Sequence, residues 1–404
     1  MQTFSGVEYL MIDAANCWGL DKEVYEVRIQ WAKDNLDNLE ALALDADDLH
    51  RYNKAVIAIR KAQRKEPSGH LVGFDAICSG MQIMSAITGC FDGASATGLI
   101  HQDQRSNAYK IVTDTMNTLL LNEVKVSLQE AKEATMTTLY GSKAMPKKIF
   151  GEDTPELAAF YTALKMVAPG AIELLQELLE SWQPFALAHK WVLPDGFTAN
   201  VKVMDDCDAR IEVDELDHAT FTYEWKENCG KPKGLSNVAN VVHSIDGYIV
   251  RCLHRRCNYK ESTVLKALGL LVGDVSGETK ESEKVSYYID LYNNSDMADV
   301  VILPYLTKSN VGLLSTKHKA ALVVLCNQML EYKPFPIVTN HDEFQCHPNN
   351  MNYLRQQYNN VLADLADSLI IQDILGQIHG CKGTYTKLSN DLSSYIRNAN
   401  YSLT

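Results

Sequence analysis

Most of the chain carries apolar residues at the three- and four-residue spacing of amphipathic helices. Residues 22–43 and 155–183 each predict a long helix, and residues 105–139 predict one or two. Residues 191–226 instead alternate apolar and polar positions and predict a ribbon of strands. Residues 271–299, rich in Gly, Ser, Glu, Lys and Asp, predict a surface insertion. The pattern as a whole indicates a mixed, helix-rich α/β protein.

Two short apolar runs predict strands that end on carboxylates. Residues 71–75 (LVGFD) end on an aspartate and precede a helix that begins near Ser79. Residues 335–347 (FPIVTNHDEFQCH) predict a hairpin whose first arm brings His341 and Asp342 to its turn. The two strands thus place one aspartate each at an end of the sheet.

Composition limits the class of protein. The 404 residues are 46% hydrophobic with no run of eighteen apolar residues, which predicts a large core in two or more lobes and no membrane span. The N-terminal segment lacks a basic region before an apolar core, so we expect no secretory signal and a cytoplasmic protein. No Cys-x-x-Cys pair occurs among ten cysteines, and the spacing of Cys252, His254 and Cys257 fits no standard zinc site. Reduced, mostly buried thiols are the expectation.

The net charge of -13 argues against a protein that coats nucleic acid, because Lys and Arg carry most phosphate binding. Any contact with nucleic acid is therefore expected to be local. Three basic clusters lie around Lys54–Lys65, Lys143–Lys148 and Arg251–Lys260. Each alone is more typical of a solvated helix face than of a binding site.

The strand-end aspartates Asp75 and Asp342 are candidate metal ligands. Two such strands side by side would gather the oxygen ligands that Mg²⁺ prefers. In nucleotidyl transfer, two metal ions about 3.5–4 Å apart stabilise the attacking and leaving oxygens. The pattern alone is weak, because 51 acidic residues offer many strand-end carboxylates.

The segment 125–143 adds a candidate nucleotide site. If it is helical, Lys132, Met136 and Tyr140 share one face, with Lys125 a heptad before Lys132. Such a face suits a nucleotide, with the cations at its phosphates and the ring at its sugar, and Gly141 can end the helix. The alternative is a lysine that packs its aliphatic stem beside a structural tyrosine.

Three motifs, in the same order, resemble those of the bacteriophage and mitochondrial single-subunit RNA polymerases. VGFDAICSGMQIMS, residues 72–85, resembles the first palm motif, with Ser79, Gly80 and Gln82 matched. Residues 132–143 resemble the fingers helix, with its Lys-x7-Tyr-Gly pattern, and His-Asp-Glu-Phe at 341–344 resembles the second palm motif. The resemblance implies DNA-templated RNA synthesis with two Mg²⁺ ions.

The resemblance also implies roles for individual residues. Asp75, Asp342 and the Ala76 carbonyl would bind the metal ions, and Lys132 would neutralise the triphosphate and protonate the leaving pyrophosphate. Tyr140 would sense the ribose 2'-hydroxyl. Further family segments assign Lys22 to the triphosphate, Tyr109 and His243 to the sugar pocket, and His341 to the primer end.

The implied fold is the right-hand polymerase fold, with palm and fingers only. Residues 1–103 would form the first part of the palm, 104–243 the fingers and 244–404 the second part of the palm, with an insertion near 256–325. No counterpart of the N-terminal promoter-binding lobe or thumb is recognised, which resembles the larger, C-terminal subunit of split podophage RNA polymerases. We therefore expect a second subunit, template DNA and nascent RNA as partners, in the cytoplasm of an infected cell.

Three departures from the family pattern stand out. Leu128 occupies the position of a fingers arginine, for which Lys125 could substitute, and Met145 replaces a template-stacking aromatic residue. The promoter-reading hairpin, near 195–230, is acidic. Its charged residues include Asp205, Asp206, Asp208, Glu212, Asp214, Glu215 and Asp217. Since such a ribbon repels duplex phosphate, we expect accessory proteins to recruit the enzyme to opened or single-stranded DNA.

Three other functions stay open from the sequence. A DNA polymerase of the related palm fold shares the aspartate pair, although its fingers helix usually has phenylalanine where this chain has Met136. An inactive scaffold would not need Asp75, Lys132 and Tyr140 at these spacings. A metal phosphohydrolase could use His341, Asp342 and His347.

Overall fold

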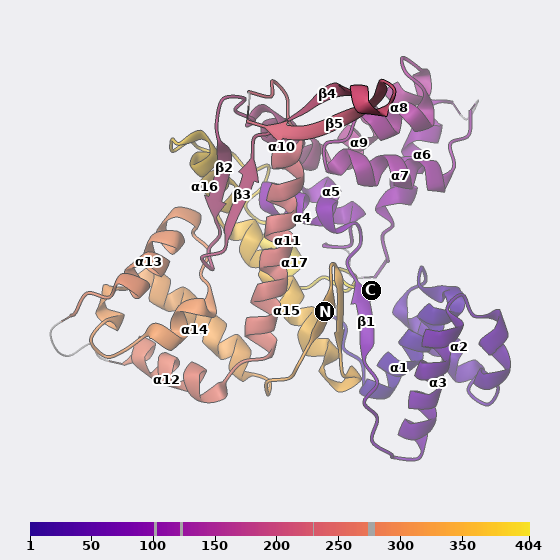
Figure 1. Cartoon of the computed structure of the whole chain (residues 1–404). Helices are drawn as coiled ribbons and strands as arrows, with labels where there is room; N and C mark the ends of the chain where they lie inside the picture. The colour runs from indigo at the N-terminus through magenta and orange to yellow at the C-terminus, as the bar shows by residue number, and fades with distance from the viewer. Residues whose placement is uncertain (101–102, 122–123, 229, 274–278) are drawn as a thin grey trace.

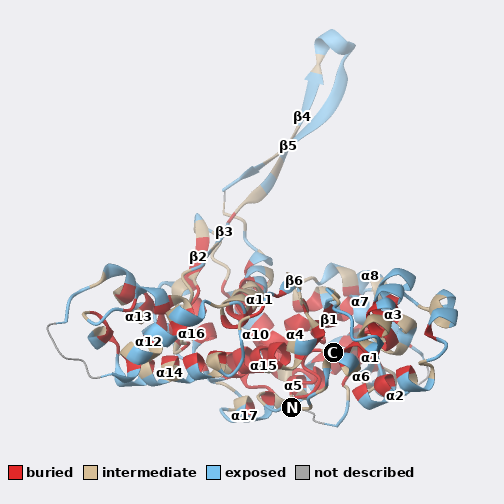
Figure 2. Ribbon diagram, turned by 90° about the horizontal axis from the view of Figure 1, so that it is seen from below, coloured by how far each residue is buried: buried red, intermediate tan, exposed pale blue. Residues whose placement is uncertain are grey.

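The computed structural model describes residues 1–100, 103–121, 124–228, 230–273 and 279–404. Helices make up most of the body, and a small antiparallel sheet lies near its middle (Figure 1). Figure 2 shows a two-stranded ribbon that projects well away from this body. The helix-rich α/β class predicted from the sequence is confirmed.

The helices and strands have the following bounds. The helices are α1 (Gly6–Ala15), α2 (Tyr25–Asp34), α3 (Leu49–Gln63), α4 (Ser79–Thr88), α5 (Phe91–Ala96), α6 (Ala108–Leu119), α7 (Leu128–Leu139), α8 (Ala144–Phe150), α9 (Pro155–Val167), α10 (Pro169–Glu180), α11 (Ser236–Cys257), α12 (Glu261–Val272), α13 (Glu283–Ser295), α14 (Thr316–Leu330), α15 (Met351–Asp367), α16 (Ile370–His379) and α17 (Leu392–Ile396). The strands are β1 (Val72–Asp75), β2 (Ala188–Val192), β3 (Thr198–Lys202), β4 (Asp205–Val213), β5 (Ala219–Glu227), β6 (Val338–Asn340) and β7 (Glu343–Cys346).

The central sheet has the order β1-β7-β6 and is antiparallel throughout. β6 and β7 form the predicted hairpin, with residues 341–342 as its turn. β1 pairs with β7 so that Phe74 lies opposite Phe344 and Asp75 opposite Glu343. Both phenylalanines are buried, so the apolar face of this sheet fixes the register. The register brings the ends of the two predicted strands together.

The final residues of the chain run back along β1. Ala76 and Leu403 form an isolated antiparallel bridge. The Asp75 amide donates to the Thr404 carbonyl at 3.2 Å, and the Thr404 amide donates to the Asp75 carbonyl at 3.0 Å. The backbone of Asp75 is therefore held on both edges of β1, by β7 and by the 403–404 segment.

α4 follows β1 directly, as predicted, and is buried along its whole length. It packs against α5, α10, α11 and α15. The connection passes through Cys78 in the left-handed conformation (φ 51°), and Gly89 ends the helix in the same conformation (φ 68°). The tight turn before α4 thus fixes how closely the helix follows the strand.

The long predicted helices are each divided. The 22–43 segment is helical over α2, breaks at Asn35 and continues as a 3-10 helix at Leu39–Asp45. The 105–139 segment forms two helices, α6 and α7, which the sequence left open. The 155–183 segment bends by 109° between α9 and α10, because Pro169 has no amide hydrogen and disfavours a helical residue before it.

No single helix of the described ranges is long and apolar enough to cross a membrane. The bent pair of α9 and α10 meets the criteria of length and composition only when the two helices are taken together. Both helices contribute buried residues to the main core, including Phe160 and Leu174.

A second hydrophobic core, separate from the main one, is built by α12, α13 and α14. Its buried residues run from Val264 to Met329. The predicted surface insertion at 271–299 differs from expectation because α13 is a helix, with Val285 and Tyr288 buried in this core. Residues 274–278 of that prediction lie outside the described residues. We call α12–α14 and the segments between them the satellite unit.

The predicted strand ribbon is confirmed as two hairpins, β2–β3 and β4–β5. In β4–β5, paired residues point to the same side and neighbours along a strand point to opposite sides. One face carries the pairs Cys207–Trp225, Ala209–Tyr223, Ile211–Phe221 and Val213–Ala219. The other face carries Asp206–Lys226, Asp208–Glu224, Arg210–Thr222 and Glu212–Thr220. Apart from the acidic pair Asp205–Glu227 on the first face, the ribbon is therefore apolar on one side and charged on the other.

The cysteine prediction also holds for the buried positions. Cys17, Cys90, Cys252, Cys257, Cys326 and Cys346 are buried free thiols. Cys229 lies outside the described residues.

Candidate active site

A cavity of about 830 Å³ lies where the central sheet meets α1, α6 and α7. Most of the predicted site residues line it, although they come from segments far apart in the chain. Those residues are Lys22, Asp75, Ala76, Ser79, Gly80, Tyr109, Lys132, Tyr140, His243, His341 and Asp342. Of the predicted residues, Gln82, Lys125 and Gly141 do not line it. Folding thus gathers the candidate residues of all three motifs around one space.

The two aspartates lie side by side at the end of the sheet. Asp75 is the last residue of β1, Asp342 is the second turn residue of the β6–β7 hairpin, and the Ala76 amide donates to the Asp342 carbonyl at 3.1 Å. His341, the first turn residue, has a left-handed backbone (φ 57°), as does Cys78. Non-glycine residues rarely adopt this conformation, and such strain clusters at functional sites.

The electrostatics around Asp75 favour a bound cation. Burial, together with the nearby carboxylates of Glu343 and Asp342, raises the pKa of Asp75 to about 6 against the opposing effect of Arg51 and Lys22. Clustered carboxylates of this kind form an oxygen-only donor set, which fits Mg²⁺. Asp75, Asp342 and the Ala76 carbonyl are the groups that could hold it.

Glu343 is a third carboxylate at the site that the sequence reasoning missed. It lies opposite Asp75 in the sheet, and its Oε1 accepts from Arg51 Nη2 at 2.5 Å. Gly73 leaves the room for this pair, because an added Cβ there would lie 2.5 Å from Glu343 Oε1. Arg51 thus compensates one of the three negative charges before any metal ion binds.

Asp246 is a further carboxylate beside the pair. It lies one turn after His243 on α11, and its Oδ2 is 3.8 Å from His341 Nδ1, which is itself 3.2 Å from Asp342 Oδ1. Burial raises the pKa of Asp246 to about 6, with His341 opposing the shift and Asp342 adding to it. The three-residue spacing from His243 on one helix face was the available signal.

Aromatic and imidazole rings also line the cavity, close to His341 and Asp342. Tyr140 lies with its ring centroid 4.8 Å from that of His243, and its hydroxyl hydrogen-bonds with Ser79. Gly80 lies beside this ring, and an added Cβ there would be in van der Waals contact with the Tyr140 hydroxyl oxygen, at 3.4 Å. Burial raises the pKa of Tyr140 to about 12, so the hydroxyl stays protonated at neutral pH. It is therefore available as a hydrogen-bond donor or acceptor.

Lys132 stands on α7 and lines the same cavity. Its ammonium lies 5.7 Å from the centre of the Tyr109 ring, at a cation–π distance. Met136, one turn further along α7, also lines the cavity. The predicted shared face of Lys132, Met136 and Tyr140 is confirmed by this common lining.

The prediction that Lys125 shares the helix face of Lys132 is wrong. The helix begins only after Ser127, whose hydroxyl accepts from the Glu130 amide in a capping box. Lys125 therefore lies before the helix and is exposed outside the cavity. Gly141 does follow the helix end as predicted, with a left-handed φ of 90°.

Gln82 supports the fold behind the cavity and does not face it. Its amide nitrogen donates to the carbonyls of Thr97 and Ser402 at 3.1 and 3.0 Å, and the Tyr358 hydroxyl donates to its oxygen at 2.5 Å. It is fully buried. These bonds tie α4 to α15 and to the C-terminal segment that pairs with β1.

The loop that carries Lys22 is held by a buried arginine. Arg28 donates to the backbone carbonyls of Asp21 and Glu23 and to the side chains of Asn16 and Thr404. Burial lowers the pKa of Arg28 to about 10, which leaves it charged at neutral pH. Lys22 itself pairs with the Asp21 carboxylate.

Comparison with known proteins agrees with the geometry. A family model described as DNA-dependent RNA polymerase matches residues 2–149. The DNA-directed RNA polymerase of Enterobacteria phage K11 is 25% identical over 341 aligned residues, which cover 61% of this chain. The chain is thus similar in sequence to phage RNA polymerases. It spans 37% of the length of the phage K11 polymerase. The family match includes Asp75 and Lys132 and ends before Asp342.

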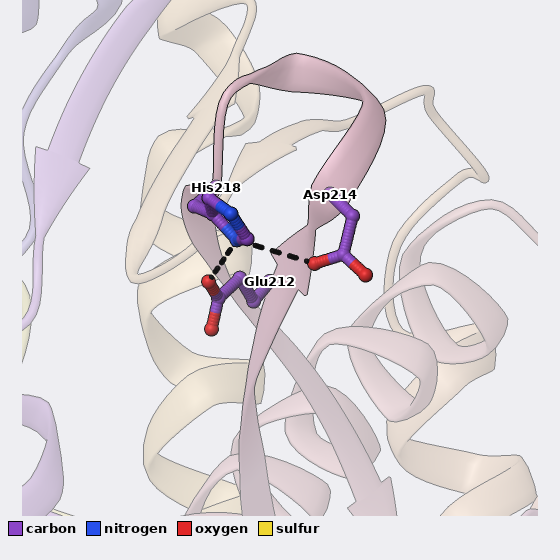
Figure 3. Close-up of side chains that lie close together, drawn as sticks. All are labelled: Glu212, Asp214 and His218. Atoms are coloured by element: carbon purple, nitrogen blue, oxygen red, sulfur yellow. Dashed lines mark ion pairs between the residues drawn. The ribbon is translucent and has the colours of Figure 1, made fainter.

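A second group of possible metal ligands lies outside this cavity. Figure 3 shows Glu212, Asp214 and His218 together at the tip of β4–β5. All three are exposed, and His218 Nδ1 lies 2.7 Å from Glu212 Oε1 and 3.3 Å from Asp214 Oδ1. These ion pairs explain the cluster, and none of its members lines the cavity.

Proposed function

We propose that this chain is the catalytic subunit of an RNA polymerase that uses a DNA template and ribonucleoside triphosphates. The single observation that carries the proposal is the common cavity. It is lined by the aspartates of β1 and of the β6–β7 turn together with Lys132 and Tyr140 of the α7 segment. A phosphohydrolase or a scaffold would not need the lysine and tyrosine in the same cavity as the carboxylates.

The proposal includes a right-hand arrangement of the chain. Residues 1–103 and 244–404 would form the palm, residues 104–243 the fingers, and the region near 256–325, which overlaps the satellite unit, an insertion. The pairing of β1 with the distant β7 supports this division, because it joins the first and last parts of the chain in one sheet.

Each residue of the cavity then has a defined task. Asp75, Asp342 and the Ala76 carbonyl would hold two Mg²⁺ ions, which lower the charge on the reacting phosphate and on the leaving group. The Lys132 ammonium would bind the triphosphate and donate a proton to the departing pyrophosphate. Lys22 would add a second positive charge at the triphosphate.

The ring side chains of the cavity would select the sugar. The Tyr140 hydroxyl, together with His243 and Tyr109, would contact the ribose and its 2'-hydroxyl. A site built to hydrogen-bond a hydroxyl discriminates against the analogue that lacks it, because its own polar group then stays unpaired. His341, between Asp342 and Asp246, would support the primer end.

The proposal includes a second polypeptide and an infected bacterial cytoplasm as the setting. The likeness to split podophage enzymes supports a heterodimer. The second subunit would supply the remaining polymerase parts, and template DNA and nascent RNA would bind across the two chains.

We further propose that the enzyme does not read a duplex promoter unaided. In the β4–β5 ribbon, acidic residues outnumber Arg210 and Lys226, and Asp208 lies directly opposite Glu224. Such a ribbon repels duplex phosphate, so accessory proteins would recruit the enzyme to opened or single-stranded DNA. Specific run-off transcription from a linear duplex by the two purified subunits alone would refute this part.

Primer extension tests the central proposal. The chain is co-expressed with its second subunit and supplied with a primed DNA template, Mg²⁺ and either ribo- or deoxyribonucleotides. We expect extension with ribonucleotides, and preferential use of deoxyribonucleotides would instead indicate a DNA polymerase. Asp342→Asn should abolish extension without disturbing subunit association, whereas Asp290→Asn, an exposed carboxylate on α13, should not change it. Full activity of Asp342→Asn would exclude the mechanism.

A further inference from the structure

The four Lys and Arg side chains that line the cavity differ in how their charge is compensated. Lys22 pairs with Asp21, and Arg51 pairs with Glu343. Lys132 lies over the Tyr109 ring. Among the described residues, Arg105 has no side-chain carboxylate within ion-pair distance, and its side chain donates only to the Thr404 hydroxyl, at 3.4 Å from Nε. Arg105 is thus a cation of the cavity without an ion-pair partner among the side chains that the structure describes.

The surroundings of Arg105 destabilise its positive charge. Its guanidinium is largely enclosed by protein, and this burial lowers its pKa, although the more distant charge of Asp21 opposes the shift. A second arginine, Arg28, donates to the same Thr404 hydroxyl at 2.9 Å, and the two positive charges disfavour each other. A desolvated cation beside another cation is stabilised when an anion binds between or beside them.

Arg105 also stands at the metal end of the cavity. The residue whose hydroxyl it contacts, Thr404, exchanges two backbone hydrogen bonds with Asp75. Lys22, the predicted triphosphate ligand, acts on Asp75 from the same neighbourhood, and its partner Asp21 acts on Arg105. An anion bound by Arg105 would therefore lie beside the ions held by the two aspartates.

The start of α6 adds a second favourable feature. Arg105 comes just before Asn107, which caps this twelve-residue helix by accepting from the Lys110 amide. Ser106, Asn107 and Tyr109 all line the cavity, so the positive end of the helix dipole faces it. Arg105 and the helix start therefore act on an anion in the same direction.

The α7 side of the cavity lacks a second cation. Leu128, one turn before Lys132, lines the cavity with an apolar side chain, and Lys125 lies outside it. A nucleoside triphosphate with two Mg²⁺ ions still carries negative oxygens that need donors on more than one side. The cation that α7 does not supply has to come from another element.

We propose that Arg105 binds the triphosphate of the incoming nucleotide and the pyrophosphate product, in place of a second cation on α7. The assignment rests on the proposed polymerase function. Arg105 offers five N–H donors in a planar fork, which suits two oxygens of one phosphate. Its present bond to the Thr404 hydroxyl is long and has an uncharged acceptor, so little is lost when the guanidinium turns to phosphate.

The test compares Arg105→Ala and Arg105→Lys with the wild type in the complex of both subunits. The measured quantities are KM and kcat for ribonucleotides in primer extension, and the inhibition constant for inorganic tripolyphosphate. For Arg105→Ala we expect KM and the inhibition constant each to rise about 10- to 100-fold, as for loss of a charge-assisted hydrogen-bond pair. Arg105→Lys should retain part of the affinity as a point charge.

Two further variants separate binding from folding. Lys110→Ala removes an exposed charge from the same helix and should leave both constants unchanged. Arg105→Ala combined with Leu128→Arg restores a cation from the α7 side and should recover part of the affinity for tripolyphosphate. A merely structural role of Arg105 would give no such recovery. If Arg105→Ala does not fold, Arg105→Gln takes its place in the same comparison.

Failure of this inference can be told apart from failure of the polymerase proposal. Normal extension by the wild type with unchanged constants in Arg105→Ala would refute the role of Arg105 alone. Absence of extension by the wild-type complex would refute the proposed function. Calorimetric titration of Mg²⁺ and tripolyphosphate into the wild-type and Arg105→Ala complexes then still decides whether Arg105 binds phosphate, and equal affinities would overturn the inference.

Discussion

Protonation of His318 should destabilise the satellite unit in a defined pH range. The side chain is 2% exposed, begins α14 in its first turn and stacks on Tyr292 with ring centroids 3.8 Å apart. Its Nδ1 is buried and has no hydrogen-bond partner in the part of the chain that the structure describes. Burial lowers the pKa of His318 from the ordinary 6.5 to about 4. A positive charge at a helix start also opposes the helix dipole, so the neutral ring is favoured.

The size of this destabilisation follows from the difference in the pKa of His318 between the folded and unfolded states. The unfolded chain takes up a proton at His318 near pH 6.5 and the folded chain only near pH 4. The contribution of the neutral His318 ring to the free energy of unfolding is therefore fully present above pH 6.5 and is lost as the pH decreases toward 4. At about 1.36 kcal/mol per pKa unit, the loss is about 2 kcal/mol at pH 5 and about 3 kcal/mol at pH 4.

Hydrogen exchange of the full chain can measure this loss locally. The amides of α14 are followed at pH 7 and pH 5, with intrinsic rates corrected, and the amides of α4 in the main core serve as the internal reference. His318→Phe keeps the stacked ring without a titratable group and should remove most of the pH dependence in α14. His50→Phe, at an exposed position on α3, should keep it. Equal pH dependence in wild type and His318→Phe would refute the reasoning.

Two substitutions test other parts of the structure. Tyr140→Phe should lower discrimination between ribo- and deoxyribonucleotides by about tenfold, the value of one hydrogen bond of about 1.4 kcal/mol, as measured by competition in primer extension. Unchanged discrimination would exclude Tyr140 as the sugar sensor. Gly170→Ala places a Cβ 2.5 Å from Thr88 Oγ1 and 2.7 Å from Cys90 Cβ, and should lower the free energy of unfolding by about 1–3 kcal/mol in denaturant titration. Gly269→Ala, with open space around it in α12, should instead be neutral or stabilising by up to about 1 kcal/mol, and equal losses in both glycine variants would contradict the packing argument.

The strand ends and the α7 face could be predicted because their signals are local. An apolar run that stops at Asp75, and a hairpin turn at residues 341–342, are both contained in a few residues. The start of α7 can also be predicted from the sequence, because Ser127 and Glu130 form the Ser-x-x-Glu pattern of a capping box. That pattern predicts that the helix begins after Ser127, so that Lys125 lies before it.

The remaining site residues depend on packing between distant segments. Arg51 comes from α3, and it enters the site only because β1 pairs with β7 and places Glu343 beside it. Arg105 lies near Asp75 because the 403–404 segment pairs with β1 and Thr404 accepts a hydrogen bond from Arg105. No spacing within one segment signals either position. The fold class followed from periodicity, but these contacts follow from tertiary pairing alone.

The two faces of the β4–β5 ribbon act in opposite directions on the solution behaviour of the protein. Phe221 and Tyr223 are more than half exposed on the apolar face, an arrangement that favours self-association. The carboxylates of the opposite face keep copies apart only while their charge is unscreened. Moderate salt shortens the range of that repulsion and leaves the aromatic strip uncovered. Purification at low ionic strength therefore suits this chain better than high salt.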